Sequence, residues 1–466
     1  MNLKIKRALI SVSDKSSLFP LIEVLKDWDV EIIASGGTKA QIEKWGFKVT
    51  ALEKITGNPS VFDGRVKSLS FEISSGLLFK RDDRSHCRQA EELGIKPIDL
   101  VVCNLYPFLE KVKQEVSNDE LLENIDIGGP TMIRAAAKNH QGVCVLSCPE
   151  QYDELIGILK RGEGAIDLAH RRKWALAAFK ATAHYESLVA TQLQKRWDKE
   201  SVSVGALVEN PVKLRYGENP TQKAWAFVDP INKGLLSHPP LQGKALSYNN
   251  LLDVDAACRC AHDLQKWDGD KQIAVIVKHG NPCGQAASAC QLTALQLAFK
   301  GDLKSSFGGV IAFNSPVKKQ TVQWLMDKFI EVIAAPSFDL GALELLKEKK
   351  NLRVLVQDKN LSSPTEVRSI WGGWLVQREE REENWELQPV TEIPFPREKE
   401  SLARFAVACV KHFKSNAISL VAEKKDDFFL IGAGMGAPNR NLALKQAMDL
   451  AVENGYESLL NQAVLA

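Results

Sequence analysis

Short runs rich in β-branched residues alternate with helix-like stretches through the first half of the sequence, and this alternation constrains the fold more than any other feature. Strands are predicted at residues 8–13, 30–35, 47–52, 100–105 and 143–148. Helices are predicted at residues 17–28, from Thr38 onward, at 152–159 and at 168–197. Because strands that alternate with helices in this way form parallel sheets covered by helices, we expect an α/β fold.

The length of 466 residues is too great for one compact core, so we expect at least two domains. Residues 195–211 are first charged and then small and polar, as in a linker. We place the boundary at Lys199, which gives domains 1–199 and 200–466. Within the second domain, residues 276–284 (IVKHGNPCG) and 409–417 (CVKHFKSNA) are alike over a few positions, which indicates an internal duplication or a chance match.

Charge and the N-terminal sequence argue against several classes of protein. A formal net charge of +2, with basic residues in short scattered clusters, gives no signal for a nucleic-acid partner. Residues 1–14 run directly into a predicted strand without a secretory signal, and no apolar run reaches membrane-spanning length. We therefore expect a soluble, cytoplasmic protein that binds no membrane.

Cysteine usage gives little sign of a metal site. The nine cysteines are scattered and form no CxxC pair, so reduced structural thiols are expected. Residues 279–286 (HGNPCGQA) suggest zinc, because nucleotide deaminases bind the metal with a PCxxC pair. Ala286 occupies the position of the second cysteine, so we predict that there is no catalytic metal.

Two polar segments follow the first two predicted strands, at 11–15 (SVSDK) and 35–38 (SGGT). Open α/β sheets bind ligands at the carboxyl ends of their strands. Hydroxyl groups, the ammonium of Lys15 and glycine amides at a helix N-terminus would suit a phosphate. Helix caps and a tight turn would use the same residue types, so these two segments alone leave both interpretations open.

Three further segments decide between them: 64–68 (GRVKS), 103–108 (CNLYPF) and 125–140 (IDIGGPTMIRAAAKNH). In this order, and over most of residues 1–200, the chain resembles the IMP cyclohydrolase domain, whose fold is similar to methylglyoxal synthase. The resemblance implies that the closing ring is surrounded by Lys67, Tyr106, Asp126 and Lys138. It implies that the nucleotide is bound by Ser13, Asp14, Lys15, Ser35, Gly36, Gly37, Thr38, Arg65, Ser68, Asn104 and Gly128.

The chemistry of ring closure suits those side chains. The carboxamide nitrogen attacks the formyl carbon, so a donor must stabilise the developing oxyanion and a base must accept an amide proton. Lys138 is the candidate proton shuttle, because clustered lysines depress one another's pKa values. The family usually continues the GRVK motif with a His-Pro pair, whereas this chain has Ser70 and Phe71, which puts the local loop geometry in question.

Four segments of the second domain, at 214–220, 246–257, 276–284 and 305–314, resemble the formyltransferase domain, whose fold is similar to a duplicated cytidine deaminase without zinc. The fold expected for the chain is therefore α/β, with a methylglyoxal-synthase-like three-layer domain followed by that duplicated domain. The resemblance implies 10-formyltetrahydrofolate as co-substrate. It places Lys278, His279 and Asn416 at the reacting amine, and Arg215, Tyr216, Gly308, Glu331 and Arg440 around the nucleotide.

Formyl transfer to a poorly nucleophilic amine calls for a base and for a cation near the oxyanion. His279 and Lys278 suit those roles, because imidazole titrates near neutral pH. Taken alone, a Lys-His pair at a strand end is more often structural, and the surrounding NPCG favours function. Thr221 replaces a histidine that is usual in the family.

The resemblance also implies a longer C-terminal tail, because the family continues for several dozen residues beyond the point that matches Ala466. In the family this tail contributes to the transferase site, so the sequence supports the cyclohydrolase half better. A natural chain without transferase activity, a split enzyme whose missing part is a separate chain, and an incomplete sequence all stay open. We expect a homodimer, since the family's transferase sites lie between subunits.

Two alternatives to a bifunctional enzyme remain. A catalytically weak nucleotide-binding protein would keep the phosphate site without turnover. An NAD-dependent dehydrogenase would use the glycine-rich residues 431–440 (IGAGMGAPNR), which follow a predicted strand. Pro438 interrupts that turn and no acidic residue follows at the expected distance, so the dehydrogenase is disfavoured.

Overall fold

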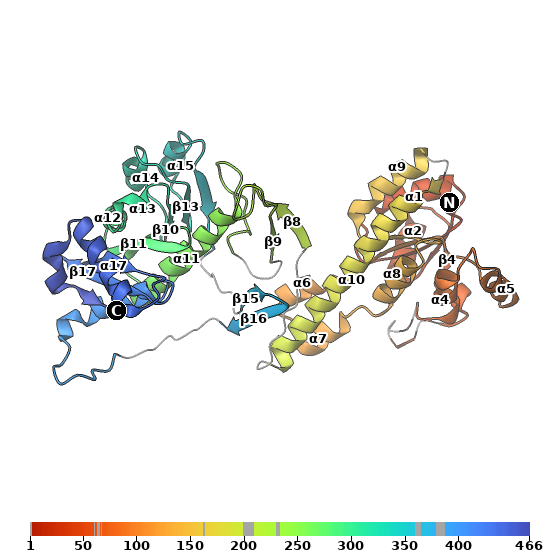
Figure 1. Ribbon diagram of the computed structural model, residues 1–466. Helices are drawn as coiled ribbons and strands as arrows, with labels where there is room; N and C mark the ends of the chain where they lie inside the picture. The colour runs from red at the N-terminus through yellow and green to blue at the C-terminus, as the bar shows by residue number, and fades with distance from the viewer. Residues whose placement is uncertain are drawn as a thin grey trace. The chain divides into compact units, whose positions relative to one another are not determined.

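The computed structural model describes residues 2–59, 61–62, 66, 68–161, 164–198, 209–229, 234–358, 365–378 and 387–466. The chain divides into two compact units, residues 1–207 and 208–466 (Figure 1). The predicted boundary at Lys199 falls within 199–208, outside the described residues. Within the described ranges, no helix is both long enough and apolar enough to span a membrane.

The N-terminal unit contains most of the strands and helices that the sequence predicts, although the second helix begins at Gly36 rather than at Thr38. Its elements are β1 (Leu3–Lys4), β2 (Arg7–Val12), α1 (Leu18–Asp27), β3 (Glu31–Ala34), α2 (Gly36–Lys44), β4 (Thr50–Ala51), α3 (Leu52–Thr56), α4 (Phe71–Leu78), α5 (Arg84–Glu92), β5 (Leu100–Asn104), α6 (Phe108–Lys113), α7 (Asn118–Glu123), α8 (Gly128–Lys138), β6 (Cys144–Leu146), α9 (Tyr152–Arg161), β7 (Ala165–Ile166) and α10 (Leu168–Trp197).

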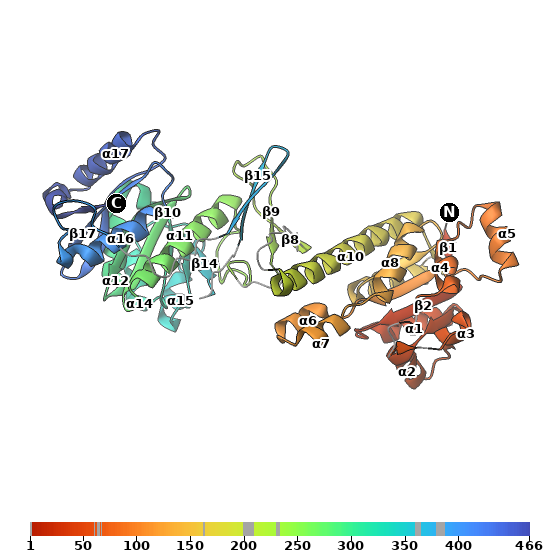
Figure 2. The same ribbon diagram turned by 90° about the horizontal axis from the view of Figure 1, so that it is seen from below.

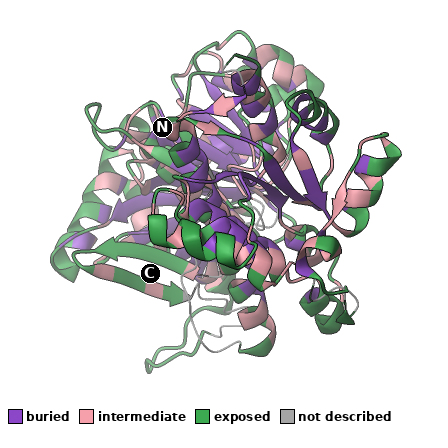
Figure 3. Cartoon of the chain, turned by 90° about the vertical axis from the view of Figure 1, so that its right-hand side faces the viewer, coloured by how far each residue is buried: buried purple, intermediate pink, exposed green. Residues whose placement is uncertain are grey.

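A parallel sheet of five strands, in the order β4-β3-β2-β5-β6, forms the middle layer of this unit. The strands read as continuous apolar runs because helices bury both faces of the sheet. Ile10 packs with α1 and α9 on one face, whereas Leu9 packs with α4 and α8 on the other. Strands β2, β3, β5 and β6 are almost entirely buried, and strands in the buried colour run through the middle of Figure 3. This arrangement confirms the predicted three-layer α/β domain.

The C-terminal unit is built around a mixed sheet of eight strands in the order β14-β13-β12-β10-β11-β18-β17-β19. Its elements are β8 (Glu209–Lys213), β9 (Trp225–Val228), α11 (Tyr248–Trp267), β10 (Gln272–Lys278), β11 (Asn281–Ser288), α12 (Gln291–Lys300), α13 (Leu303–Ser306), β12 (Val310–Phe313), α14 (Lys319–Leu325), β13 (Val332–Ala335), α15 (Leu340–Leu346), β14 (Arg353–Val356), β15 (Thr365–Ile370), β16 (Gly373–Arg378), α16 (Glu400–Val410), β17 (Ile418–Lys424), β18 (Asp427–Gly434), α17 (Arg440–Glu453) and β19 (Val464–Leu465).

The order of elements repeats within this unit. The series α11-β10-β11-α12-β12 corresponds to α16-β17-β18-α17-β19, with α11 and α16 packed on one face of the sheet and α12 and α17 on the other (Figure 2). Each hairpin has a register shift near the same place, between Ile276 and Val277 in β10 and between Leu420 and Val421 in β17. Strands β11 and β18 pair antiparallel, as expected at the centre of two copies related by a two-fold axis.

The sequence match that first indicated the repeat is wrong in its alignment. Residues 276–278 end strand β10, whereas residues 409–410 end helix α16 and do not belong to a strand. Lys411 and His412 follow that helix and contact the carboxylate of Asp263 on α11, at 2.7 and 3.2 Å. The corresponding part of the second copy is the β17–β18 hairpin.

The dinucleotide-binding alternative is also not supported by the topology. The glycine-rich segment follows β18, and β18 is antiparallel to both of its neighbours, β11 and β17. A dinucleotide-binding loop joins a strand to a helix within a parallel βαβ unit. Gly434 has a packing role instead, because a Cβ atom there would lie 1.8 Å from the carbonyl oxygen of Ala443 in α17.

The glycine that follows each hairpin bulge lets a helix approach the sheet closely. A Cβ atom at Gly284 would lie 2.0 Å from the Ala298 carbonyl oxygen, and one at Gly432 would lie 2.1 Å from that of Ala447.

We expect Gly284→Ala to lower the free energy of unfolding by about 1–3 kcal/mol, because the backbone of α12 must move. Urea unfolding measures the loss. Gly269→Ala is the matched control, since no atom lies within 4 Å of its added Cβ, and an equal effect of both variants would contradict the close approach.

Candidate active sites

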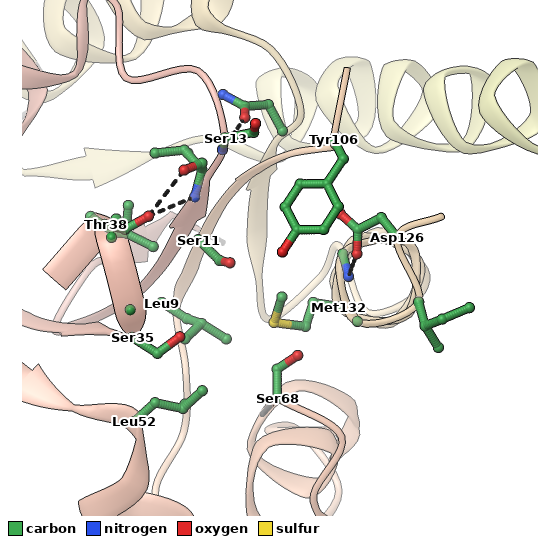
Figure 4. Close-up of a pocket in the computed structure, with 18 of the residues that line it drawn as sticks. Leu9, Ser11, Ser13, Ser35, Thr38, Leu52, Ser68, Tyr106, Asp126 and Met132 are labelled. Atoms are coloured by element: carbon green, nitrogen blue, oxygen red, sulfur yellow. Dashed lines mark hydrogen bonds between the residues drawn. The ribbon is translucent and has the colours of Figure 1, made fainter. Parts of the chain in front are cut away.

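A cavity of about 710 Å³ lies at the carboxyl ends of β2 and β5 in the N-terminal unit. The strand order reverses at this point: β3 and β4 follow β2 toward one edge of the sheet, whereas β5 and β6 lie on the other side of β2. Sheets of this kind bind ligands where the order reverses. Figure 4 shows this cavity with several of its lining side chains. The predicted residues that line it are Ser13, Lys15, Ser35, Gly36, Gly37, Thr38, Ser68, Asn104, Tyr106, Asp126 and Gly128.

Two of these side chains hold the cavity wall together. Asn104 Oδ1 accepts hydrogen bonds from the amides of Ser13 (2.6 Å) and Asp14 (3.0 Å), and its Nδ2 donates to the Asp14 carbonyl (2.8 Å). The Thr38 hydroxyl lies 3.1 Å from both the amide and the carbonyl oxygen of Val12. Asp14 is not among the lining residues, and its carboxylate accepts from the Ser16 amide at 2.8 Å. These contacts fix the loop from which Ser13 and Lys15 reach the cavity.

The N-terminus of α2 makes one corner of the cavity suitable for an anion. Gly36 has φ of 51°, a left-handed conformation that favours glycine. A Cβ atom at Gly37 would lie 4.0 Å from Lys15 Nζ, so the ammonium lies directly beside the first turn of the helix. Helix amides and a cation together form an anion site, and Ser35 and Ser68 add hydroxyl groups to the same cavity.

Asp126 and Tyr106 form the opposite side of the cavity (Figure 4). Asp126 Oδ1 accepts from the Gly129 amide (2.8 Å), and the Tyr185 hydroxyl accepts from the Asp126 amide (2.7 Å). Burial raises the pKa of the Asp126 carboxyl above its ordinary value. Burial and the nearby Asp126 also raise the pKa of Tyr106, so the phenol keeps its proton. The pair offers a proton donor next to a carboxylate that binds a proton more readily than usual.

Lys138 lies in a neighbouring cavity of about 660 Å³ at the end of α8. Asp126 lines both cavities, so the cavity of Lys138 adjoins the one that contains the N-terminus of α2. Arg65 and Lys67 lie outside the described residues, so the predicted lysine cluster stays a prediction. Ser70, at the departure from the family motif, caps α4 by accepting a hydrogen bond from the Ile73 amide at 3.2 Å.

Strand register places the predicted transferase residues at one edge of the C-terminal sheet. The β10–β11 turn carries His279, β10 pairs antiparallel with β12, and β13 and β14 run parallel to β12. Gly308 and Glu331, which precede β12 and β13, therefore lie at the edge where Lys278 ends β10. Since β11 and β17 are both antiparallel to β18, Asn416 before β17 and Arg440 after β18 also lie at this edge.

Side-chain contacts tie these loops together. Lys278 Nζ donates to the Phe307 carbonyl oxygen at 2.7 Å, next to Gly308. Glu331 Oε2 accepts from Asn250 Nδ2 at 2.9 Å and lies 3.6 Å from Arg353 Nη1. The result is a charged surface that carries both an ammonium and a carboxylate.

The other predicted transferase residues lie in loops that backbone hydrogen bonds hold in place. The Arg215 amide donates to the carbonyl oxygen of Leu246, and the Tyr248 amide donates to the carbonyl oxygen of Tyr216. These bonds anchor the 214–217 loop at the start of α11. The Arg215 guanidinium lies 5.3 Å from the centre of the Tyr216 ring. Asn416 Nδ2 donates to the Ala437 carbonyl oxygen at 3.0 Å, which joins the loop before β17 to the loop after β18.

The cysteine in the segment that suggested zinc is a core residue. Cys283 is buried, its thiol lies 3.5 Å from the Ile276 carbonyl oxygen, and burial raises its pKa to about 12. A metal ligand must lose its proton, which this environment opposes. Over the part of the chain that the structure describes, no group of three or more His, Cys, Asp or Glu side chains could hold a metal ion.

Comparison with known proteins identifies the family. A family model described as the AICARFT/IMPCHase bienzyme matches residues 136–450, and one described as an MGS-like domain matches residues 17–131. The chain belongs to the AICARFT/IMPCHase bienzyme family. The bifunctional purine biosynthesis protein PurH of Bacillus subtilis (strain 168) is 41% identical over 465 residues, which cover 98% of this chain and 89% of that protein.

A second relative gives a similar match. The protein of the same name from Lactobacillus acidophilus is 40% identical over 472 residues, which cover 99% of this chain and 89% of that protein. A solved structure titled "Crystal structure of ForH" is 32% identical and covers 40% of this chain and 96% of its own. Its TM-score of 0.37 is too low to support a comparison of folds.

Sequence reasoning missed three polar residues at the sheet edge that carries the predicted transferase residues. Asn250 and Arg353 hold Glu331, and Asp253 accepts from the amides of the β10–β11 turn. Asn250 and Asp253 fall inside a segment that resembles the family, but a helical Asn or Asp carries no signal of its own. Arg353 begins a buried strand, where the sequence shows only apolar neighbours.

The raised pKa of Asp126 leads to a prediction about stability. A carboxyl group whose pKa is raised by folding stabilises the protein fully below its ordinary pKa, and that stabilisation is lost as pH rises through the raised value. We expect Asp126→Asn, which keeps an acceptor for the Gly129 amide, to be more stable than the parent at pH 8, by about 1.4 kcal/mol for each unit of pKa shift.

Thermal unfolding from pH 4 to pH 8 measures this difference, which should shrink toward pH 4. Asp82→Asn, at an exposed position of the same unit, is the control and should show no such trend. A stability difference for Asp126→Asn that is the same at both pH values would contradict the burial of a charged carboxylate.

Proposed function

We propose that this chain catalyses the last two steps of de novo IMP synthesis. It transfers a formyl group from 10-formyltetrahydrofolate to aminoimidazole carboxamide ribonucleotide and then closes the ring with loss of water. The main support for this proposal is the match to the family over nearly the whole chain. In each unit, residues that resemble the family's site residues also lie together at one edge of the sheet. We assign ring closure to the N-terminal unit and formyl transfer to the C-terminal unit.

For ring closure, the phosphate binds at the N-terminus of α2, beside Lys15. The ring then lies toward Tyr106 and Asp126 on the far side of the same cavity. Tyr106 donates a hydrogen bond to the oxyanion that forms when the carboxamide nitrogen attacks the formyl carbon. Lys138, reached through Asp126, shuttles the proton that leaves the nitrogen, and the hydroxyl group then departs as water.

For formyl transfer, the nucleotide lies along the edge formed by Arg215, Tyr216, Gly308 and Glu331. His279 removes the amine proton as the nitrogen attacks the formyl group of the folate, and Lys278 stabilises the oxyanion of the tetrahedral intermediate. The intermediate then collapses with cleavage of the bond between the formyl carbon and N10 of the folate, and the proton held by His279 passes to N10 as tetrahydrofolate leaves. Side chains supply every proton transfer, so the proposal requires no metal. The repeated order of elements supports a relationship to duplicated cytidine deaminases.

Location and assembly complete the proposal. We place the enzyme in the cytoplasm, where the nucleotide and folate substrates are found, without a nucleic-acid or membrane partner. We expect a homodimer, in which the transferase site of one subunit borders the other.

Two reactions test the proposal. The purified protein is incubated with the formylated ribonucleotide, and IMP is followed by absorbance. It is then incubated with the unformylated nucleotide and 10-formyltetrahydrofolate. IMP from both mixtures is expected. IMP from the first mixture alone would leave a cyclohydrolase without transferase activity, and IMP from neither would point to a binding protein.

A further inference from the structure

We propose that Asp253 is a positioning residue for formyl transfer, because its carboxylate fixes the turn that presents Lys278 and His279. This inference rests on the proposed function of the C-terminal unit and deepens it. Asp253 does not reach the substrate in this proposal. It acts through the backbone of the β10–β11 turn.

The turn itself has a demanding conformation. His279 and Gly280 are the only two residues between the paired Lys278 and Asn281, and their φ angles are 52° and 71°. A two-residue hairpin with positive φ at both positions follows the right-handed twist of the strands, and Asn or Gly is preferred at both. A histidine at the first position is held in a disfavoured left-handed conformation. A contact from outside the turn would therefore stabilise it.

Asp253 makes the contacts that hold the turn. Its Oδ1 accepts from the Gly280 amide at 2.6 Å and its Oδ2 accepts from the His279 amide at 3.3 Å. Hydrogen bonds to a carboxylate are about twice as strong as those between neutral groups. Burial raises the pKa of Asp253, and the two amides act in the opposite direction, so the turn stabilises the charged form. Both oxygens are engaged with the backbone on either side of His279.

Helix α11 supplies a rigid base for this contact. Its first turn is capped by Ser247 and Asn250, which exchange hydrogen bonds with each other's amides. Val254 and Ala257 anchor the helix in the core. Asn250 lies three residues before Asp253, on the same helix face, and holds Glu331. One helix therefore sets the position of Glu331 relative to Lys278 and His279.

The second hairpin shows that the fold can build such a turn with a different contact. Between β17 and β18, Lys425 and Asp426 also have positive φ angles, of 50° and 67°. There the Lys271 ammonium donates to the carbonyl and carboxylate oxygens of Asp426, each at 2.7 Å. A carboxylate directed at the turn amides is thus a feature of the copy that carries the Lys-His pair, and hairpin formation alone does not explain it.

The first test compares Asp253→Ala and Asp253→Asn in the full-length protein. We expect Asp253→Ala to lower kcat for formyl transfer about 100-fold, the effect of a misplacement of about 1 Å, with KM for the nucleotide nearly unchanged. Asp253→Asn should fall between, because its amide oxygen keeps the Gly280 contact while its amino group meets the His279 amide. Ring closure by the N-terminal unit is the internal control. Asp255→Ala, which removes a carboxylate paired with Arg259 at 2.8 Å on the same helix, is the matched variant.

A second measurement keeps this inference separate from the proposed function. Hydrogen exchange of a peptide that spans residues 276–284 should be faster in Asp253→Ala than in the parent, even if the parent transfers no formyl group. Lack of formyl transfer by the parent would refute the transferase assignment. Unchanged hydrogen exchange in Asp253→Ala would refute the proposal that Asp253 holds the β10–β11 turn. A rise in KM with unchanged kcat, or an equal loss of ring closure, would show that Asp253 is not a positioning residue.

Discussion

Replacing Lys138 with alanine is expected to lower the rate of ring closure by about 10²–10⁴-fold, the usual contribution of a general acid or base. Lys138 ends α8 and shares a cavity with Asp126, which also lines the cavity at the N-terminus of α2. We propose that the nucleotide phosphate binds in the other cavity, beside Lys15. The variant should therefore bind nucleotide with nearly the parental affinity while turnover is lost.

Two measurements separate these effects. Formation of IMP from the formylated ribonucleotide gives the rate of ring closure, and calorimetric titration with IMP gives affinity. Lys173→Ala is the control, since Lys173 is exposed on α10 and pairs with Glu154 at 2.7 Å, outside both cavities. If Lys138→Ala closed the ring at the parental rate, the proton shuttle would have to be another group.

The predicted N-terminal fold agrees with the structure because its signals are local. Four of the five predicted runs each form one largely buried strand, and the run at 47–52 forms only the short, partly buried β4. The polar segments at 11–15 and 35–38 follow two adjacent parallel strands, so their meeting at one edge is a consequence of topology. The roles of individual side chains in the cavity could not be predicted from the sequence in this way. Asn104 and Thr38 use their polar atoms on the backbone of residues 12–14, a choice that depends on distances of about 3 Å across the sheet.

The internal repeat shows a different limit of sequence reasoning. What the two copies share is the order of elements, a bulge and the glycine that follows it, Gly284 or Gly432, because helix and sheet approach closely there. The more conspicuous Lys-His pairs are not equivalent, since Lys411 and His412 follow a helix and contact Asp263. Backbone geometry was repeated while side chains diverged, so matching the letters gave the wrong alignment. Asp253 was missed because its partners are backbone amides, which leave no mark in a sequence.

Replacing His279 with asparagine is expected to lower formyl transfer by about 10²–10⁴-fold through loss of the base on the reacting amine. Asparagine is the appropriate replacement because it tolerates the positive φ of 52° at this position, so the turn and its contacts with Asp253 should persist. Ring closure of the formylated nucleotide should continue at the parental rate, since we assign that reaction to the other unit.

The measurement is IMP formation from the unformylated nucleotide and 10-formyltetrahydrofolate, with the formylated nucleotide as the parallel substrate. His238→Asn is the matched control, because His238 is a half-exposed histidine of the same unit whose imidazole lies 3.7 Å from Asp358. Slow transfer with normal ring closure would locate the defect at the turn. Parental transfer by His279→Asn would exclude the imidazole as the base and would leave the Lys278 ammonium, held at 2.7 Å from the Phe307 carbonyl oxygen, as the group on which transfer depends.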